Sequence, residues 1–157
     1  MITGSFFSQG SFALPSNGDP KFRSRSLSIS VLDSQVDAKY LKVLLVDDNV
    51  DLLDIAETLF RRNGFEVFTA ASGPEAVEIL RRTPDIGVLF TDVVMPGMSG
   101  IQLGHEARKI LPDIKVILVS GYANAAANAG HGGLRDFDFL NKPYRFDEIA
   151  RLLHKPN

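Results

Sequence analysis

Five polar side chains that could share one site each follow a short apolar segment of the chain: Asp47, Asp48, Asp92, Ser120 and Lys142. Strands buried in a parallel sheet read as short, nearly continuous apolar runs. Functional groups in such sheets collect at the carboxyl ends of the strands. We therefore expect three carboxylates, a hydroxyl and an ammonium at one rim of a sheet.

This set of groups suits a particular chemistry. Carboxylates only a few ångströms apart repel one another by roughly 4 kcal/mol per pair at an effective dielectric constant of about 20. A hard divalent cation relieves that repulsion, and a site made only of oxygen ligands favours Mg²⁺. The same cation neutralises phosphoryl oxygens. An isolated Asp at a strand end is more often a turn residue or a helix cap, so the interpretation depends on the joint occurrence of all five residues.

The elements that must position these residues alternate along the chain. Apolar runs predict strands at 43–46, 86–90 and 116–119, and the more polar runs at 65–69 and 137–140 suit the edges of a sheet. Helical patterns lie between them. In the first helix, we expect Leu52, Ala56, Leu59 and Phe60 to fall on one face.

The later helices carry recognisable start signals. A serine at Ser72 and another at Ser99 are each followed three residues later by an acid or amide, which is the pattern of a capping box. A fourth helix at 123–129 should be short because glycines follow it, and a fifth spans about 145–153. The resulting series of βα units predicts an α/β protein with a parallel sheet and helices on both faces.

Composition narrows the class of protein. The chain has 157 residues, a net charge of −2, no cysteine and no apolar run long enough to span a membrane. These features argue against disulfides, cysteine-based zinc sites and broad attraction to nucleic acid or a membrane. No secretory signal is evident, so we expect a cytoplasmic protein. Residues 1–38 are rich in serine without a helical period, and we expect a flexible N-terminal extension before a single domain at 41–157.

From about residue 41 onward, the chain resembles the receiver domains of two-component response regulators. The resemblance rests on four blocks in the expected order: VLLVDD (43–48), TDVVMPGMSG (91–100), VSGYA (119–123) and FLNKP (139–143). It implies a flavodoxin-like (βα)5 three-layer sandwich with a parallel sheet of order 2-1-3-4-5. That order places the first, third and fourth strands side by side.

The resemblance also implies roles at the acidic site. Asp92 would be the phosphorylation site, accepting a phosphoryl group from a phosphohistidine. Asp48 and Asp92 would bind Mg²⁺ directly, Asp47 through water, and Val94 through its backbone carbonyl.

Further residues would act on the phosphoryl group and on signalling. Ser120 would donate its hydroxyl to the phosphoryl group, and Lys142 would pair with a phosphoryl oxygen. Phe139 matches the aromatic switch position, which turns inward when Ser120 moves. Val94 and Tyr122 border the path of a hydrolytic water and would modulate the lifetime of the phosphorylated state. The bond between Lys142 and Pro143 is expected to be cis.

Two functions from other classes fit the sequence less well. A phosphatase of the dehalogenase type also uses a strand-end Asp with Mg²⁺, but it needs a second Asp where this chain has Val94. A binding-only pseudo-receiver usually lacks one of the acidic residues or the lysine, and all are present here. We therefore expect a receiver that catalyses only its own phosphorylation and dephosphorylation.

The expected partners follow from the family. They are a histidine kinase or histidine phosphotransfer protein and a downstream protein target, without direct contact to nucleic acid or a membrane. The resemblance also implies a surface for a homodimer, made by the fourth helix, fifth strand and fifth helix. The chain ends after the fifth helix, which favours a stand-alone receiver over a receiver fragment of a larger regulator or hybrid kinase.

Overall fold

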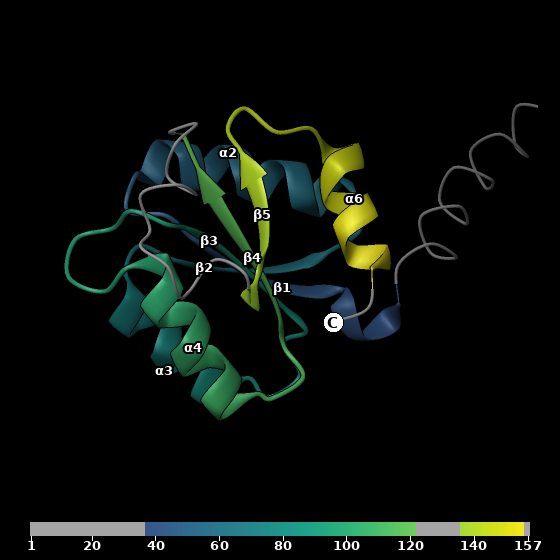
Figure 1. Ribbon diagram of the computed structural model, residues 1–157. Helices are drawn as coiled ribbons and strands as arrows, with labels where there is room; N and C mark the ends of the chain where they lie inside the picture. Colours follow the sequence, from purple (N-terminus) through teal and green to yellow (C-terminus); the bar gives the residue numbers. More distant parts are fainter. Residues whose placement is uncertain (1–36, 122–135, 156–157) are drawn as a thin grey trace, which may run out of the picture. The chain divides into compact units, whose positions relative to one another are not determined.

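A five-stranded parallel sheet forms the centre of the protein. The computed structural model describes residues 37–121 and 136–155. The strands lie in the order β2-β1-β3-β4-β5 (Figure 1). Their bounds are β1 (Lys42–Val46), β2 (Glu66–Ala70), β3 (Val88–Asp92), β4 (Lys115–Ser120) and β5 (Asp138–Asn141). The predicted 2-1-3-4-5 topology is confirmed, and the two more polar strands do lie at the edges.

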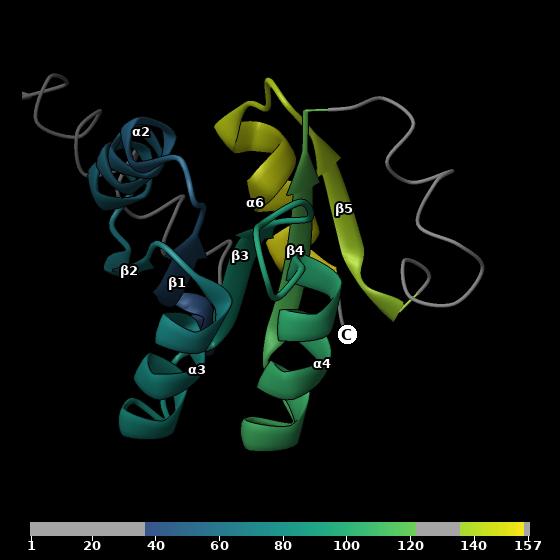
Figure 2. The same ribbon diagram turned by 90° about the vertical axis from the view of Figure 1, so that its left-hand side faces the viewer.

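Helices cover both faces of this sheet. They are the 3₁₀ helix η2 (Ala38–Tyr40) and the α-helices α2 (Val50–Arg62), α3 (Gly73–Arg82), α4 (Gly100–Ile110) and α6 (Phe146–His154). Helices α2 and α6 pack on one face, and α3 and α4 on the other (Figures 1 and 2). The helix predicted at 123–129 lies outside the described residues, as do residues 1–36 of the predicted extension.

Side-chain hydrogen bonds cap the N-termini of α3 and α4 and so fix where these helices begin. Ser99 and Gln102 form the predicted capping box at α4, each side chain accepting a backbone N–H from the other residue. At α3, Ser72 accepts the N–H of Glu75, but the Glu75 carboxylate accepts the N–H of Ala71 instead of that of Ser72. The second hydrogen bond of the predicted capping box is therefore shifted by one residue: its donor is the N–H of Ala71, at 2.8 Å from the Glu75 carboxylate.

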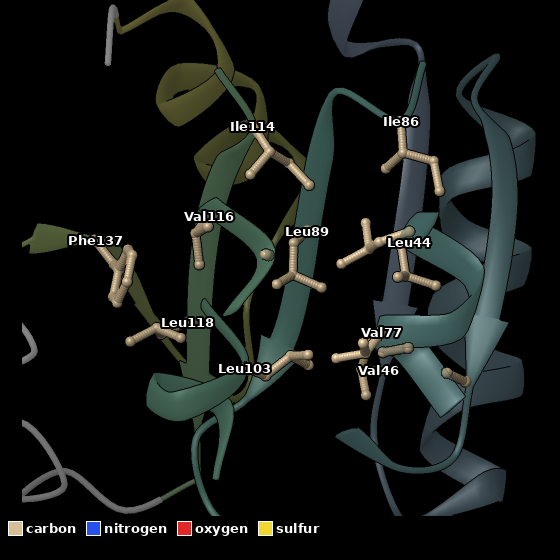
Figure 3. Packing of buried hydrophobic residues seen from close by; sticks show 14 of the residues in the cluster. Leu44, Val46, Val77, Ile86, Leu89, Leu103, Ile114, Val116, Leu118 and Phe137 are labelled. Carbon is tan, nitrogen blue, oxygen red and sulfur yellow. The ribbon is translucent and has the colours of Figure 1, made fainter. Parts of the chain in front are cut away.

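Alternating residues of the central strands supply two separate cores. On β1, Val43 and Leu45 face α2 and α6, whereas Leu44 and Val46 face α3 and α4. Figure 3 shows the second core, in which Leu103 of α4 packs over the sheet. Because the inner strands are buried on both faces, their sequences are continuously apolar.

Leu52, which the sequence predicts on the same face of α2 as Ala56 and Phe60, is not buried. Leu53, Ala56 and Phe60 are buried, whereas Leu52 is 41% exposed. The buried stripe follows the spacing i, i+3, i+7, and Leu52 lies one residue, or about 100°, away from Leu53. Its position is therefore at the margin of the stripe.

A buried ion pair fastens the end of α6 to the sheet. The Lys115 side chain is fully buried, and its Nζ lies 3.0 Å from Asp138 Oδ2 and 2.6 Å from the carbonyl oxygen of Lys155. A buried charge is tolerated only with such partners. Lys115 and Lys155, which are 40 positions apart in sequence, are thereby joined through one ammonium.

Candidate functional site

The Lys142 ammonium lies between two carboxylates at the carboxyl edge of the sheet. Its Nζ is 2.8 Å from Asp47 Oδ2 and 2.9 Å from Asp92 Oδ2. The three side chains are largely buried, with 21%, 12% and 15% of their surfaces exposed for Lys142, Asp47 and Asp92. Lys142 is 95 positions from Asp47 and 50 positions from Asp92 in sequence, yet the three side chains form one charged cluster.

Parallel strand pairing brings these residues together. Val46 of β1 is in register with Thr91 of β3, so Asp47 and Asp92 follow at the same level. The N–H of Lys142 donates to the carbonyl oxygen of Ser120 at 2.8 Å, which extends the pairing of β4 with β5. The peptide bond between Lys142 and Pro143 is cis, as predicted.

Backbone amides orient the remaining carboxylate oxygens. Asp47 Oδ1 accepts the N–H of Asn49 at 2.9 Å, and Asp92 Oδ1 accepts the N–H of Val94 at 2.9 Å. Each carboxylate is therefore held at one oxygen by the main chain and at the other by Lys142. The loop after Asp92 is tight, because a Cβ at Gly100 would collide with the carbonyl oxygen of Asp92.

The electrostatic balance keeps Lys142 charged. Burial alone would lower the pKa of this lysine, but the hydrogen bonds to Asp47 and Asp92 and their negative charges outweigh burial and raise the pKa above its usual value. The ammonium is consequently present at neutral pH and partly cancels the repulsion between the two carboxylates.

The other predicted site residues lie around this cluster. Asp48 is exposed, Val94 is 59% exposed, Ser120 is only 1% exposed, and Phe139 is partly buried against the core under α3 and α4. Tyr122 lies outside the described residues. Within residues 37–121 and 136–155, no group of three or more acidic, histidine or cysteine side chains is arranged as a metal site. The expected cluster of three carboxylates is thus a pair around Lys142 with Asp48 turned to the surface.

Two features of the site were missed from the sequence. Tyr144, two residues after Lys142, lines a small hollow together with Asp47, Asp92 and Lys142. Near the site, the first turns of α2 expose Val50 (58%) and Ile55 (65%). In the sequence, Val50 and Ile55 do not share the spacing of the buried residues 53, 56 and 60, and this difference could have indicated that they are exposed.

A sequence model of the response regulator receiver domain matches residues 43–154. This chain belongs to that family. Receiver domains share the sheet order found here. No helix in the described parts of this receiver has the length and apolar character to cross a membrane.

Relatives of this receiver differ in how much of their length it matches. The response regulator receiver protein CpdR of Brucella abortus is 32% identical over 73% of this chain and 94% of its own length. The sensor kinase CckA of the same bacterium is 39% identical over 69% of this chain but only 12% of its own length. The crystal structure of the response regulator protein TrrA from Thermotoga maritima, in complex with Mg²⁺-BeF, has a TM-score of 0.61 at 26% identity, covering 70% of this chain and 93% of that one.

Proposed function

We propose that this receiver accepts a phosphoryl group on Asp92 in the presence of Mg²⁺ and signals through protein contacts. The observation that carries the proposal is the pair of contacts from Lys142 Nζ to Asp47 and Asp92 at the carboxyl edge of the sheet. A nucleophilic carboxylate needs a nearby cation for the charge that gathers on the incoming phosphoryl group. Lys142 supplies that charge.

The residues act in a simple order in this proposal. An oxygen of Asp92 attacks the phosphorus of a phosphohistidine, and the phosphorus–nitrogen bond breaks as the phosphorus–oxygen bond forms. Lys142 then exchanges its contact with Asp92 Oδ2 for a phosphoryl oxygen and keeps its contact with Asp47. The N–H of Val94 holds Asp92 Oδ1 and so fixes which oxygen is free to react.

The donors beside Asp92 fit Mg²⁺ in kind. Asp48 and Asp92 would bind it directly, Asp47 through water, and Val94 through its carbonyl oxygen, which makes an all-oxygen set. When bound, Mg²⁺ neutralises phosphoryl oxygens during transfer. The exposed position of Asp48 leaves its carboxylate accessible to such an ion.

Signalling would pass from Ser120 to Phe139. Ser120 is buried at the end of β4, and Phe139 lies on the adjacent strand, where Leu118 is its partner in register. A hydroxyl drawn toward the phosphoryl group would leave space into which the partly buried Phe139 ring can turn. The downstream target would read that change at β5 and the elements around it.

The exposed apolar start of α2 suits the phosphodonor protein. Val50, Leu52 and Ile55 are 58%, 41% and 65% exposed, and Asn49, the N-cap of this helix, donates its N–H to Asp47. Large exposed apolar side chains that cluster beside a reactive site indicate a docking surface. A histidine kinase or phosphotransfer protein with an apolar helical face is the partner that we propose.

We also propose that the chain works as a stand-alone cytoplasmic receiver with no enzymatic activity beyond its own phosphorylation and dephosphorylation. The near-complete match to CpdR supports this proposal, while the match to a small part of CckA supports a receiver within a larger kinase. Val94, at the place of the second Asp that a dehalogenase-type phosphatase needs, argues against that enzyme class.

Beryllofluoride, or a small phosphodonor such as phosphoramidate, tests the proposal in the presence of Mg²⁺. The wild type should gain one modification, visible by intact-mass spectrometry for the phosphoryl group and by fluorine NMR for beryllofluoride. Asp92→Asn should gain none, while Asp54→Asn, an exposed carboxylate on α2, should behave as the wild type. The same mass gain in wild type and Asp92→Asn would place the phosphoryl group elsewhere.

A further inference from the structure

Tyr144 is held close to the charged cluster without taking part in it. It lies in the segment between β5 and α6, and its partly buried ring packs edge-on against Phe90 of β3, with ring centroids 5.2 Å apart and planes at 77°. Phe90 precedes Asp92 by two residues on the same strand, so the tyrosine ring is fixed relative to the proposed nucleophile.

A small hollow separates Tyr144 from the acidic pair. It is lined by Asp47, Asp92, Lys142 and Tyr144, with apolar walls from side chains such as Leu53 and Phe90. The volume open to a water molecule is about 10 Å³, which is close to the smallest cavity that holds one water. Such a cavity binds water only when several polar groups face it, and this one has polar groups on more than one wall.

The Tyr144 hydroxyl is a donor in need of an acceptor. Burial raises the pKa of Tyr144, and the charges of Asp47 and Asp92 raise it further while Lys142 lowers it, so the hydroxyl keeps its proton and lies near these charges. In the described part of the chain, no side chain or backbone group forms a hydrogen bond with it. A polar group that is withdrawn from water without a hydrogen-bond partner is destabilising, and the hollow has space for such a partner.

We propose that one ordered water occupies this hollow, accepts the hydrogen of the Tyr144 hydroxyl and donates to the carboxylates of Asp47 and Asp92. Tyr144 is then a positioning residue: it holds Asp47 through the water, and Asp47 holds Lys142. The inference rests on the proposed function, because the position of Lys142 matters only if Asp92 accepts phosphate. Its effect should be greatest during transfer, when Lys142 exchanges Asp92 for the phosphoryl group and retains Asp47 as its fixed contact.

A crystal structure of the full chain at high resolution tests the water directly. The wild type should show a water within hydrogen-bonding distance of Tyr144 Oη and of a carboxylate oxygen of Asp47 or Asp92. In Tyr144→Phe this water should be absent or displaced. A dry hollow in the wild type, or a Tyr144 hydroxyl bonded directly to a protein group, would overturn the proposal.

Kinetics test the positioning role. At saturating phosphoramidate and Mg²⁺, Tyr144→Phe should accept phosphate roughly three- to tenfold more slowly than wild type, the size expected for one lost hydrogen bond. The concentrations of donor and Mg²⁺ that give half the maximal rate should not change, which separates positioning from a general loss of structure.

Tyr40→Phe is the matched control, since Tyr40 is a buried tyrosine just before β1, at the end of that strand opposite Asp47. It should phosphorylate at the wild-type rate. An unchanged rate in Tyr144→Phe, or an equal loss in Tyr40→Phe, would contradict the positioning role. A wild type that accepts no phosphate would overturn the proposed function and the positioning role together, while the crystallographic water would still decide the content of the hollow.

Discussion

Lys142 and a bound Mg²⁺ would compete for the same pair of carboxylates. The ammonium already lies within 2.9 Å of Asp47 Oδ2 and Asp92 Oδ2, so part of their negative charge is neutralised before any metal arrives. Weak metal binding is the natural result, because the cation must enter a site whose charge is already reduced. The residue that assists phosphoryl transfer therefore limits metal affinity.

Lys142→Met should separate these two effects. Removal of the charge should strengthen Mg²⁺ binding several-fold, because the metal no longer opposes an ammonium, and should slow phosphorylation by more than about tenfold. Isothermal titration calorimetry measures the first effect and phosphoramidate kinetics the second. Lys109→Met, which removes an exposed lysine paired with Glu106 on α4, is the control. Weaker Mg²⁺ binding in Lys142→Met would contradict the competition.

Asp48 should be required for the metal. At a Mg²⁺ concentration ten times its dissociation constant, binding should add about 1.4 kcal/mol to the free energy of unfolding. Asp48→Ala should lose this gain, and Asp51→Ala, in the first turn of α2, should retain it. Differential scanning calorimetry with and without Mg²⁺ gives the answer, and an intact Mg²⁺-dependent shift in Asp48→Ala would argue against this ligand.

The same residues make the protein sensitive to alkaline pH. The pKa values of Lys142 and Tyr144 are both raised in the folded state above ordinary values of about 10.4 and 10, so the folded protein binds more protons than the unfolded chain above about pH 10. Stability should therefore be complete below pH 10 and fall as the pH rises through the folded values. Urea titrations from pH 9 to 11.5 should show a smaller decline in Lys142→Met than in the wild type.

At the scale of elements, α2 combines two surfaces that its sequence does not separate cleanly. Leu53, Ala56 and Phe60 face the core, while Val50 and Ile55 are exposed to solvent. Both sets are apolar, so burial could not be assigned from hydropathy alone, and Leu52 was placed on the wrong one. The outward residues are conspicuous because ordinary helix surfaces carry polar side chains there.

Ile55→Glu should therefore block transfer from a phosphohistidine protein and leave phosphorylation by phosphoramidate unchanged. A buried interfacial charge without a partner commonly costs several kcal/mol of binding free energy, so transfer should fall by at least about tenfold. Arg62→Glu introduces the same side chain on the same helix, about 10 Å farther along, and should have little effect. Equal losses with both phosphodonors would show that the substitution damages the site itself.

How well the sequence predicted the fold differs between elements for physical reasons. The runs at 43–46 and 116–119 became β1 and β4 almost residue for residue, because burial on both faces leaves no room for polar side chains. The serine start signals at α3 and α4 were found because capping is local in sequence. The contacts of Lys142 with Asp47 and Asp92 could be expected once the strand ends were aligned. The hollow beside Tyr144 could not, because it depends on how side chains from β1, β3 and α2 fit together.

At the scale of the whole receiver, two clusters of charge lie at opposite ends of the sheet. One is the acidic site after β1 and β3, and the other is the ion pair of Lys115 with Asp138, where β4 and β5 begin. Phosphorylation changes the charge at the first. The predicted dimer through the fourth helix, fifth strand and fifth helix stays a prediction, because the fourth helix lies outside the described residues.

Lys115→Ala should be among the more destabilising single substitutions in the chain. It leaves Asp138, whose side chain is 16% exposed, without its buried partner, and such changes commonly cost about 3–5 kcal/mol. Lys155→Ala removes a side chain that is 66% exposed, keeps the backbone carbonyl that Lys115 binds, and should cost no more than about 1 kcal/mol. Urea unfolding of both variants measures the loss in the free energy of unfolding. Similar losses in the two variants would show that the buried ion pair stabilises the fold no more than the exposed one.

The burial of Lys115 also makes it a chemical reporter of motion. The other described lysines, including Lys142, expose part of their side chains, so an amine-acylating reagent can reach them in the native protein. Lys115 can react only when the corner formed by β4, β5 and the end of α6 opens. Its rate of acylation, followed by peptide mass spectrometry, would therefore time the opening of that corner in molecules that remain otherwise folded.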